Sequence, residues 1–110
     1  MAGGNKMTAV EIKEKLRYQE FEISLHAFEE AVDDFLSLEE VINAVLENGE
    51  VIEDNPDDFR CLAHCKSKQQ HVHVAFDYHD MIKGLRAEIE IVTIYKPDPA
   101  LWINYRKRKR

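Results

Sequence analysis

The sequence has few of the residues that build phosphate-binding loops, disulfide frameworks or membrane spans. Its 110 residues include four glycines, three prolines and two cysteines, and two of the glycines lie at positions 3 and 4. The sequence therefore contains no glycine-rich phosphate-binding loop. No serine lies in the G-x-S-x-G context that is typical of α/β-hydrolases. On one extended strand Cys61 and Cys65 would lie about 13 Å apart, too far for a mutual disulfide.

The chain also lacks a long apolar run that could span a membrane. Residues 1–7 carry no apolar stretch typical of a signal peptide, so we expect a cytoplasmic protein with no membrane partner. A chain of 110 residues can build one core. We predict a disordered tail over residues 1–7, a single domain over residues 8–105 and a basic C-terminal tail over residues 106–110.

Charge is unevenly distributed along the sequence. The formal net charge of −6 argues against a protein that binds nucleic acid by electrostatics alone. Residues 106–110 are nevertheless all basic. Such a tail is usually a solvated end, and the alternative is an arm that contacts phosphates. Arg106 and Arg108, together with Arg60 and Lys96, are therefore the candidate RNA-binding residues.

N-cap residues followed by apolar residues at helical spacing predict three helices in the first half of the chain. The N-caps are Thr8, Ser24 and Ser37. In the second helix, the apolar residues that we expect to face the core are Ala27, Phe28, Ala31, Val32 and Phe35. Gly49 is predicted to end the third helix in a left-handed conformation.

From Glu50 onward the apolar pattern changes to a period of two. Strands are predicted over residues 50–53, 59–66, 71–78 and 88–97, and residues 21–23 are a candidate edge strand. A loop over residues 79–85 and a short terminal helix that holds Trp102 and Tyr105 complete the prediction. The expected fold is α+β, with N-terminal helices packed on one face of a curved, mainly antiparallel four-stranded sheet.

Alternation in the last two strands predicts an open sheet face that carries polar side chains. We expect Val72, Val74, Phe76, Val92 and Ile94 to face the helices. The opposite face then presents His71, His73, Thr93 and Tyr95. Thr93 and Tyr95 are either simple strand formers at a strand end or the lining of a site.

Histidine is the most informative residue type for chemistry. His26 lies in the first turn of its predicted helix, where the helix dipole disfavours a protonated imidazole. It is either a neutral base or a side chain that bonds the backbone to fix the turn. His71 and His73 share a strand face at a spacing of about 7 Å. That spacing suits a metal ion, two groups around a scissile phosphate, or simply a polar surface.

Cys61, Cys65, His71 and His73, with His64 nearby, raise the alternative of a small zinc-binding domain. No C-x-x-C pair is present, and both cysteines could reach one ion only if the strand had a bulge. The leading prediction includes no metal and no cofactor.

Several short motifs occur together in a specific order. They are the segments 24–27, 48–54, 56–58, 73–74 and 92–99, with acidic pairs at 29–30 and 33–34 and a tryptophan at 102. This set, which covers nearly everything from Thr8 to Trp102, resembles the small prokaryotic proteins grouped as domain-of-unknown-function family 4258.

The resemblance implies a RelE-like toxin of a type II toxin–antitoxin pair that cleaves RNA without metal. Its matching catalytic positions are His26, His73, Thr93 and Tyr95, and its expected partners are RNA and an antitoxin with a zinc-finger segment. The chain departs from the family where Phe35-Leu36 and residues 67–70 replace glycine-bearing turns. The competing hypothesis is a non-catalytic protein-interaction domain that binds a partner by strand addition.

Overall fold

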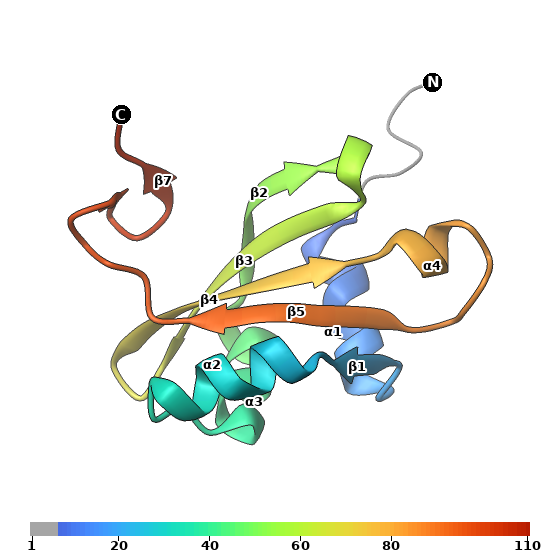
Figure 1. The fold of residues 1–110 in the computed structure, drawn as a ribbon, viewed down its shortest axis with the longest axis horizontal. Coiled ribbons are helices and arrows are strands. Elements are labelled where there is room, and N and C mark those ends of the chain that lie inside the picture. The colour runs from blue at the N-terminus through green and yellow to red at the C-terminus, as the bar shows by residue number, and fades with distance from the viewer. Residues whose placement is uncertain (1–6) are drawn as a thin grey trace.

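The computed structural model describes residues 7–110, which form a sheet with helices packed against it (Figure 1). In chain order the elements are α1 (Ala9–Arg17), β1 (Phe21–Ile23), α2 (Leu25–Asp33), α3 (Leu38–Asn48), β2 (Glu50–Asn55), a 3-10 helix (Pro56–Asp58), β3 (Arg60–Ser67), β4 (Gln70–Asp77), α4 (His79–Ile82), β5 (Ile89–Tyr95), β6 (Trp102–Ile103) and β7 (Lys107–Arg108). None of the helices between residues 7 and 110 has the length and apolar character that a membrane span requires.

The main sheet has five strands in the order β1-β5-β4-β3-β2, and β6 and β7 form a separate hairpin. The α+β class is confirmed, but the predicted four-stranded sheet is wrong in detail. β1 pairs with β5 in parallel, with Phe21 opposite Ile89 and Ile23 opposite Ile91, so the sheet is mixed. Local alternation cannot reveal this pairing, because the two strands lie far apart in the sequence.

The three predicted helix starts are confirmed. Thr8 forms a capping box with Glu11, and the side chains of Ser24 and Ser37 accept hydrogen bonds from backbone N–H groups of their own first turns. Each cap satisfies an N–H group that the helix itself leaves unpaired. The disordered tail predicted over residues 1–7 lies outside the described residues, except for Met7. Met7 is buried in the core.

Gly49 ends α3 in a different way from the prediction. Its backbone is extended, with φ −66° and ψ 140°, so a left-handed cap is wrong. Glycine is needed here because there is no room for a side chain, and not because the backbone adopts an unusual conformation. A Cβ at position 49 would lie 2.6 Å from the carbonyl oxygen of Val45.

A bulge in β5 changes which of its side chains face the core. Ala75 pairs with Thr93 while Phe76 pairs with Ile91, so Val92 is the extra residue. Ile91 and Ile94 are both buried in the core, whereas Val92 is only partly buried. The predicted alternation is therefore wrong across the bulge, since one inserted residue reverses the face of everything that follows. Thr93 does lie on the face opposite to the core.

α2 runs beside β5 with its small residues facing inward. Ala27 and Ala31 are fully buried, but Phe28, Val32 and Phe35 are 49%, 55% and 93% exposed. The prediction that all five apolar residues face the core is wrong for the three large ones. Alanine allows the helix to approach the strand closely, which leaves the bulky side chains on the outer surface.

Two further predictions for the second half are corrected. The expected loop over residues 79–85 begins with the short helix α4, and the expected terminal helix is the β6–β7 hairpin. The hairpin turn places Asn104 and Tyr105 at φ 52° and 61°, and Trp102 pairs with Arg108. In Figure 1 this hairpin folds back from the end of β5 toward β2 and β3.

Candidate functional site

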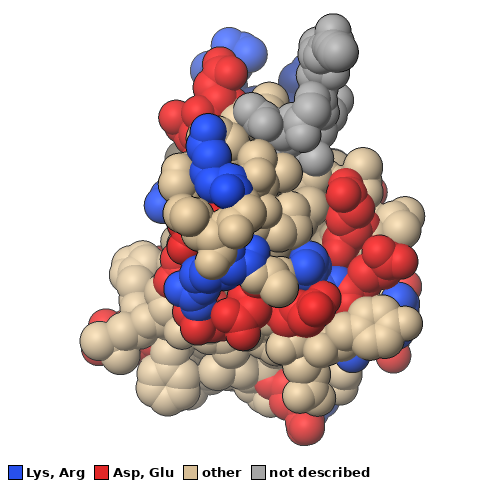
Figure 2. Space-filling view, turned by 90° about the vertical axis from the view of Figure 1, so that its right-hand side faces the viewer, with Lys and Arg blue, Asp and Glu red and all other residues tan. Residues whose placement is uncertain are grey.

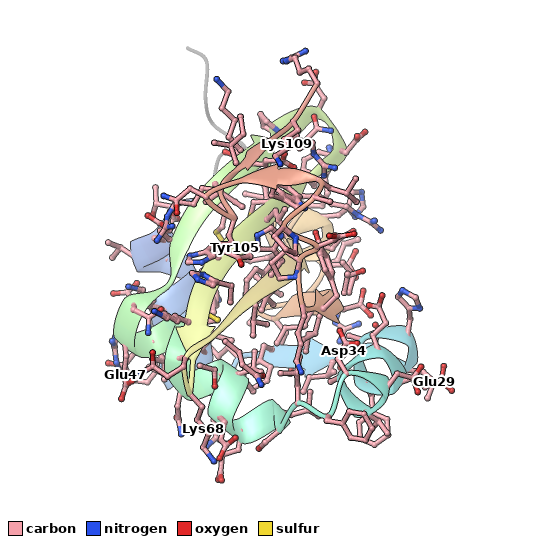
Figure 3. All side chains as sticks on the ribbon, turned by 90° about the vertical axis from the view of Figure 1, so that its left-hand side faces the viewer. Glu29, Asp34, Glu47, Lys68, Tyr105 and Lys109 are labelled. Atoms are coloured by element: carbon pink, nitrogen blue, oxygen red, sulfur yellow. The ribbon has the colours of Figure 1, made fainter. Side chains whose placement is uncertain are left out.

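The open face of the sheet collects histidine and tyrosine side chains from three adjacent strands. His64 on β3 lies opposite His73 on β4, and His73 lies opposite Tyr95 on β5. The predicted placement of His73, Thr93 and Tyr95 on one face is therefore confirmed. The C-terminal hairpin lies over one end of this face, and Figure 3 shows Tyr105 between the hairpin and the strands.

His73 is completely buried and both of its ring nitrogens have partners. Nε2 lies 2.7 Å from the carbonyl oxygen of Tyr105, and Nδ1 lies 3.1 Å from the hydroxyl of Tyr95. A carbonyl can only accept, so Nε2 carries the proton and Tyr95 donates to Nδ1. Burial lowers the pKa of His73 below its ordinary value, although the Tyr105 carbonyl acts in the opposite direction. The ring is therefore neutral at pH 7.

Aromatic contacts hold the hairpin against the histidines. The Tyr105 ring stacks on His71, with centroids 3.8 Å apart and planes 7° apart, and Trp102 meets the edge of His73 at 4.4 Å. Tyr105 has a positive φ, a conformation that L residues with a side chain adopt at a cost. Its stacking and its hydrogen bond to His73 offset that cost.

His64 and His71 form a second histidine pair beside the first. Nε2 of His64 lies 2.9 Å from Nδ1 of His71. Nδ1 of His64 has no hydrogen-bond partner within the described part of the chain but lies 3.4 Å from a Glu50 carboxylate oxygen. Burial, reinforced by Arg106, lowers the pKa of His64 to about 4. The sequence analysis considers His64 only as a member of a zinc cluster. A two-residue turn in the predicted hairpin would have placed it opposite His73.

Arg106 and Arg108 belong to the hairpin and bond to carboxylates of β2. Arg106 contacts Glu50, and Arg108 makes a two-pronged contact with Glu53 at 2.7 and 3.1 Å. The guanidinium of Arg108 also lies over the Trp102 ring, 4.7 Å from its centroid. Two cations of the predicted basic tail thus hold the hairpin onto the sheet.

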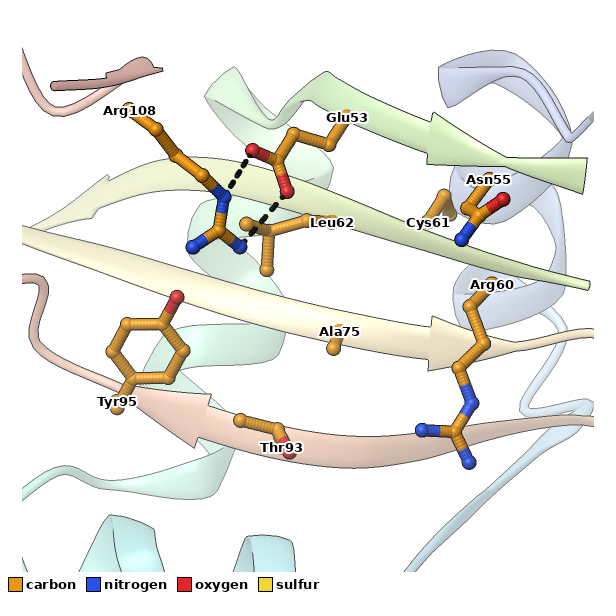
Figure 4. Close-up of a pocket in the computed structure, with 9 residues that line it drawn as sticks. All are labelled: Glu53, Asn55, Arg60, Cys61, Leu62, Ala75, Thr93, Tyr95 and Arg108. Carbon is orange, nitrogen blue, oxygen red and sulfur yellow. Dashed lines mark hydrogen bonds and ion pairs between the residues drawn. The ribbon is translucent and has the colours of Figure 1, made fainter. Parts of the chain in front are cut away.

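A groove of about 320 Å³ lies beside this cluster on the open face (Figure 4). It brings together four of the residues predicted from sequence, which are Arg60, Thr93, Tyr95 and Arg108. Figure 4 shows the Tyr95 hydroxyl on the side of Arg108, with Arg60 at the far end of the groove. Glu53 also lines the groove, and no local sequence signal marks that residue. Burial raises the pKa of Tyr95, so its phenol is protonated at neutral pH.

His26 and Lys96 do not line this groove. The His26 side chain is exposed on α2, with Nε2 3.3 Å from a Glu30 carboxylate oxygen, so it neither fixes the turn through the backbone nor approaches the core. Glu30 also accepts from the backbone N–H of Ile94, and Asp34 accepts from that of Lys96. These two acids, one in α2 and one at its C-cap, satisfy backbone N–H groups at the C-terminal end of β5 and just after it, where β1 no longer pairs with the strand.

The cysteines lie on the opposite face of the sheet from the histidines. Cys61 and Cys65 are buried in the hydrophobic core, and burial raises the pKa of each thiol to about 12. Within residues 7–110 no three His, Cys, Asp or Glu side chains are grouped to hold a metal ion. The protonated thiols act as small core residues in this arrangement.

Charge on the protein surface is mixed. Figure 2 turns the α4 side of the molecule toward the viewer, and basic and acidic side chains alternate over this view. Arg86, which follows α4 in the chain, contacts Glu22 and Glu88. The part of this face that the structure describes therefore shows no continuous basic patch.

Comparison with known proteins gives one match. The family model described as "Domain of unknown function (DUF4258)" matches residues 23–99, a stretch that runs from the end of β1 past the end of β5. No curated protein and no solved structure matches the chain significantly. The match covers most of the chain, including β3, β4 and β5, which carry the histidine and tyrosine cluster. The chain therefore belongs to the DUF4258 family.

Proposed function

We propose that this protein is a metal-independent endoribonuclease, the toxin component of a type II pair with a RelE-like fold, and that the open-face groove binds its RNA. The observation that carries the proposal is the composition of the groove. Arg60, Thr93, Tyr95 and Arg108 line it together, and His73 is hydrogen-bonded directly behind Tyr95. A tyrosine and a buried imidazole supply proton transfer, and two guanidinium groups supply charge stabilisation, which are the two contributions that phosphodiester cleavage without a metal requires.

The Tyr95–His73 pair can move the protons that cleavage requires. The ribose 2′-hydroxyl transfers its proton to the Tyr95 oxygen as the phenol proton passes to Nδ1 of His73. The 2′-oxygen attacks phosphorus, and the bond to the 5′-oxygen breaks. The proton then returns through Tyr95 to the 5′-oxygen, leaving a 2′,3′-cyclic phosphate and a 5′-hydroxyl. The carbonyl of Tyr105, which accepts from Nε2, stabilises the transient imidazolium.

Arg108 is the group best placed to stabilise charge on the phosphorane, since it lies on the same side of the groove as the Tyr95 hydroxyl (Figure 4). Arg60 at the far end would bind a neighbouring phosphate. Thr93, between them, would donate a hydrogen bond to ribose or phosphate oxygen. His26 and Lys96 have no role in this proposal because neither lines the groove.

An RNA cleavage assay in the presence of EDTA tests the proposal. Wild-type protein should produce fragments that end in 2′,3′-cyclic phosphate, and Tyr95→Phe should lower the rate by about 10²-fold or more. Tyr18→Phe is the matched control, because Tyr18 is 70% exposed at the end of α1 and does not line the groove. Absence of cleavage by the wild type, or equal rates for both tyrosine variants, would refute the mechanism.

A second candidate function is a non-catalytic interaction domain, and charge pairing favours it. Arg108 is bonded to Glu53 and Arg60 to Asp77 at 3.1 Å, so both guanidinium groups already have anionic partners. β2 is an edge strand of the main sheet and offers a place for strand addition by a partner chain. Copurification with the product of the adjacent gene, with no RNA cleavage by the protein after that partner is removed, would favour this function over the first.

A further inference from the structure

The outer face of α2 carries a row of exposed apolar side chains. Leu25, Phe28, Val32 and Phe35 are 72%, 49%, 55% and 93% exposed. Leu25, Phe28 and Val32 are spaced by three and four residues, which places them on one side of the helix, and Phe35 follows directly at its C-terminal end. We call these four residues the α2 apolar row. It borders the buried alanines of the same helix, on the side that turns toward solvent.

Phe35 occupies a backbone position that favours glycine. Its N–H bonds the carbonyl of Val32 at 3.0 Å, and the N–H of Leu36 bonds that of Ala31 at 2.8 Å. This pair of hydrogen bonds is the Schellman motif, in which the first residue after the cap takes a left-handed conformation. Phe35 has φ 58° there, and its ring is almost fully exposed. The monomer therefore bears backbone strain at Phe35 without gaining packing from its side chain, a combination that indicates a function.

Acidic side chains border the α2 apolar row. Glu29 and Asp33 are exposed on α2, and neither makes an ion pair with another residue of the described chain. Figure 3 shows Glu29 pointing away from the body of the protein, whereas Asp34 lies toward the sheet. In a symmetric antiparallel pair of α2 helices, Glu29 and Asp33 of the two copies would face one another. Like charges at that distance oppose such a pair, so the charges favour a basic partner over a second copy.

We infer that the α2 apolar row docks an amphipathic helix of another protein whose apolar face is flanked by lysine and arginine. Apolar side chains of such a helix pack against Phe28, Val32 and Phe35, and its basic flanks pair with Glu29 and Asp33. This surface is separate from the RNA groove, so the inference goes beyond the proposed function. Its test does not depend on RNA cleavage.

Two synthetic 20-residue helical peptides provide the probes. Both carry the same leucine face, and one has lysine and arginine on its flanks while the other has glutamate. Wild-type protein should bind the basic peptide in fluorescence anisotropy, more weakly as salt is raised, and should not bind the acidic one. Phe35→Gly should lower the affinity by about tenfold or more, as for a large aromatic anchor of an interface. Its thermal unfolding midpoint should stay equal to that of the wild type or rise, because glycine relieves the strain.

Val10→Ala is the control, since Val10 is 68% exposed on α1 and outside the row, and it should bind as the wild type does. Failure of the basic peptide to bind, equal binding of both peptides, or unchanged affinity for Phe35→Gly would overturn the inference. A dimer in sedimentation that Phe35→Gly dissociates would assign the surface to a second copy instead. Row-dependent binding to phosphatidylcholine vesicles would assign it to a membrane.

Discussion

Acidification from pH 7.5 to pH 5.0 should weaken the fold through His64. Its side chain is 3% exposed and one ring nitrogen faces His71. The other nitrogen has no hydrogen-bond partner among residues 7–110 and lies 3.4 Å from a Glu50 carboxylate oxygen. A charged imidazole in this place would lose its hydration and would face Arg106 and two further histidines, and these effects outweigh the opposite influence of Glu50. For these reasons the pKa of His64 is lowered to about 4, whereas an unfolded histidine titrates near pH 6.5.

The sign and size of the effect follow from these two pKa values. Because the unfolded chain binds the proton more tightly, each proton taken up between pH 6.5 and pH 4 favours unfolding. The stability conferred by neutral His64 is complete above about pH 6.5 and is lost as the pH falls to about 4. At pH 5 the expected loss is about 2 kcal/mol, and over the whole interval it is about 3 kcal/mol.

Urea unfolding of the wild type and of His64→Gln, each at pH 7.5 and pH 5.0, measures this effect. The loss of unfolding free energy on acidification should be about 2 kcal/mol smaller in His64→Gln, because glutamine does not titrate. His26→Gln, which replaces an exposed histidine of α2, controls for the substitution itself. The reasoning is refuted if His64→Gln and wild type lose the same stability, or if NMR titration places the pKa of His64 above 6.

Three further predictions concern packing and hydrogen bonds within the protein. Gly49→Ala should cost about 1–3 kcal/mol in urea unfolding, because the added Cβ would clash with Val45; a cost within error of zero would contradict this. Asp54→Ala should cost about 1–3 kcal/mol by leaving the buried Tyr78 hydroxyl, now 2.9 Å from the carboxylate, without its acceptor. Once Asp54 is replaced by alanine, a further Tyr78→Phe change should cost little unfolding free energy, because the hydroxyl has already lost its acceptor. A large further loss would show that the hydroxyl does not act through its bond to Asp54. Trp102→Ala should free the C-terminal hairpin, which would appear as faster tryptic cleavage with an unchanged far-UV circular dichroism spectrum; an unchanged cleavage rate would show that Trp102 does not hold the hairpin.

The features that could be predicted from sequence are those set by residues close together in the chain. Thr8, Ser24 and Ser37 begin helices because an N-cap bonds N–H groups two or three residues away. His71 and His73 share the open face because side chains alternate along any strand. The family resemblance and the α+β class depend on such local patterns in order, and both are confirmed.

The tertiary structure decided how these segments meet. The parallel pairing of β1, the bulge at Val92 and the fold-back of the hairpin each depend on contacts between segments distant in the sequence. The same holds for the role of Tyr105, whose carbonyl and ring cover His73 and His71.

α2 shows most clearly the difference between what the sequence predicts and what tertiary packing decides. By sequence, its alanines and its large apolar residues form one helical face. In the structure, close packing against β5 admits only the alanines. Which part of an apolar face is buried depends on the room that its neighbour leaves, and a residue's own hydrophobicity does not contain that information.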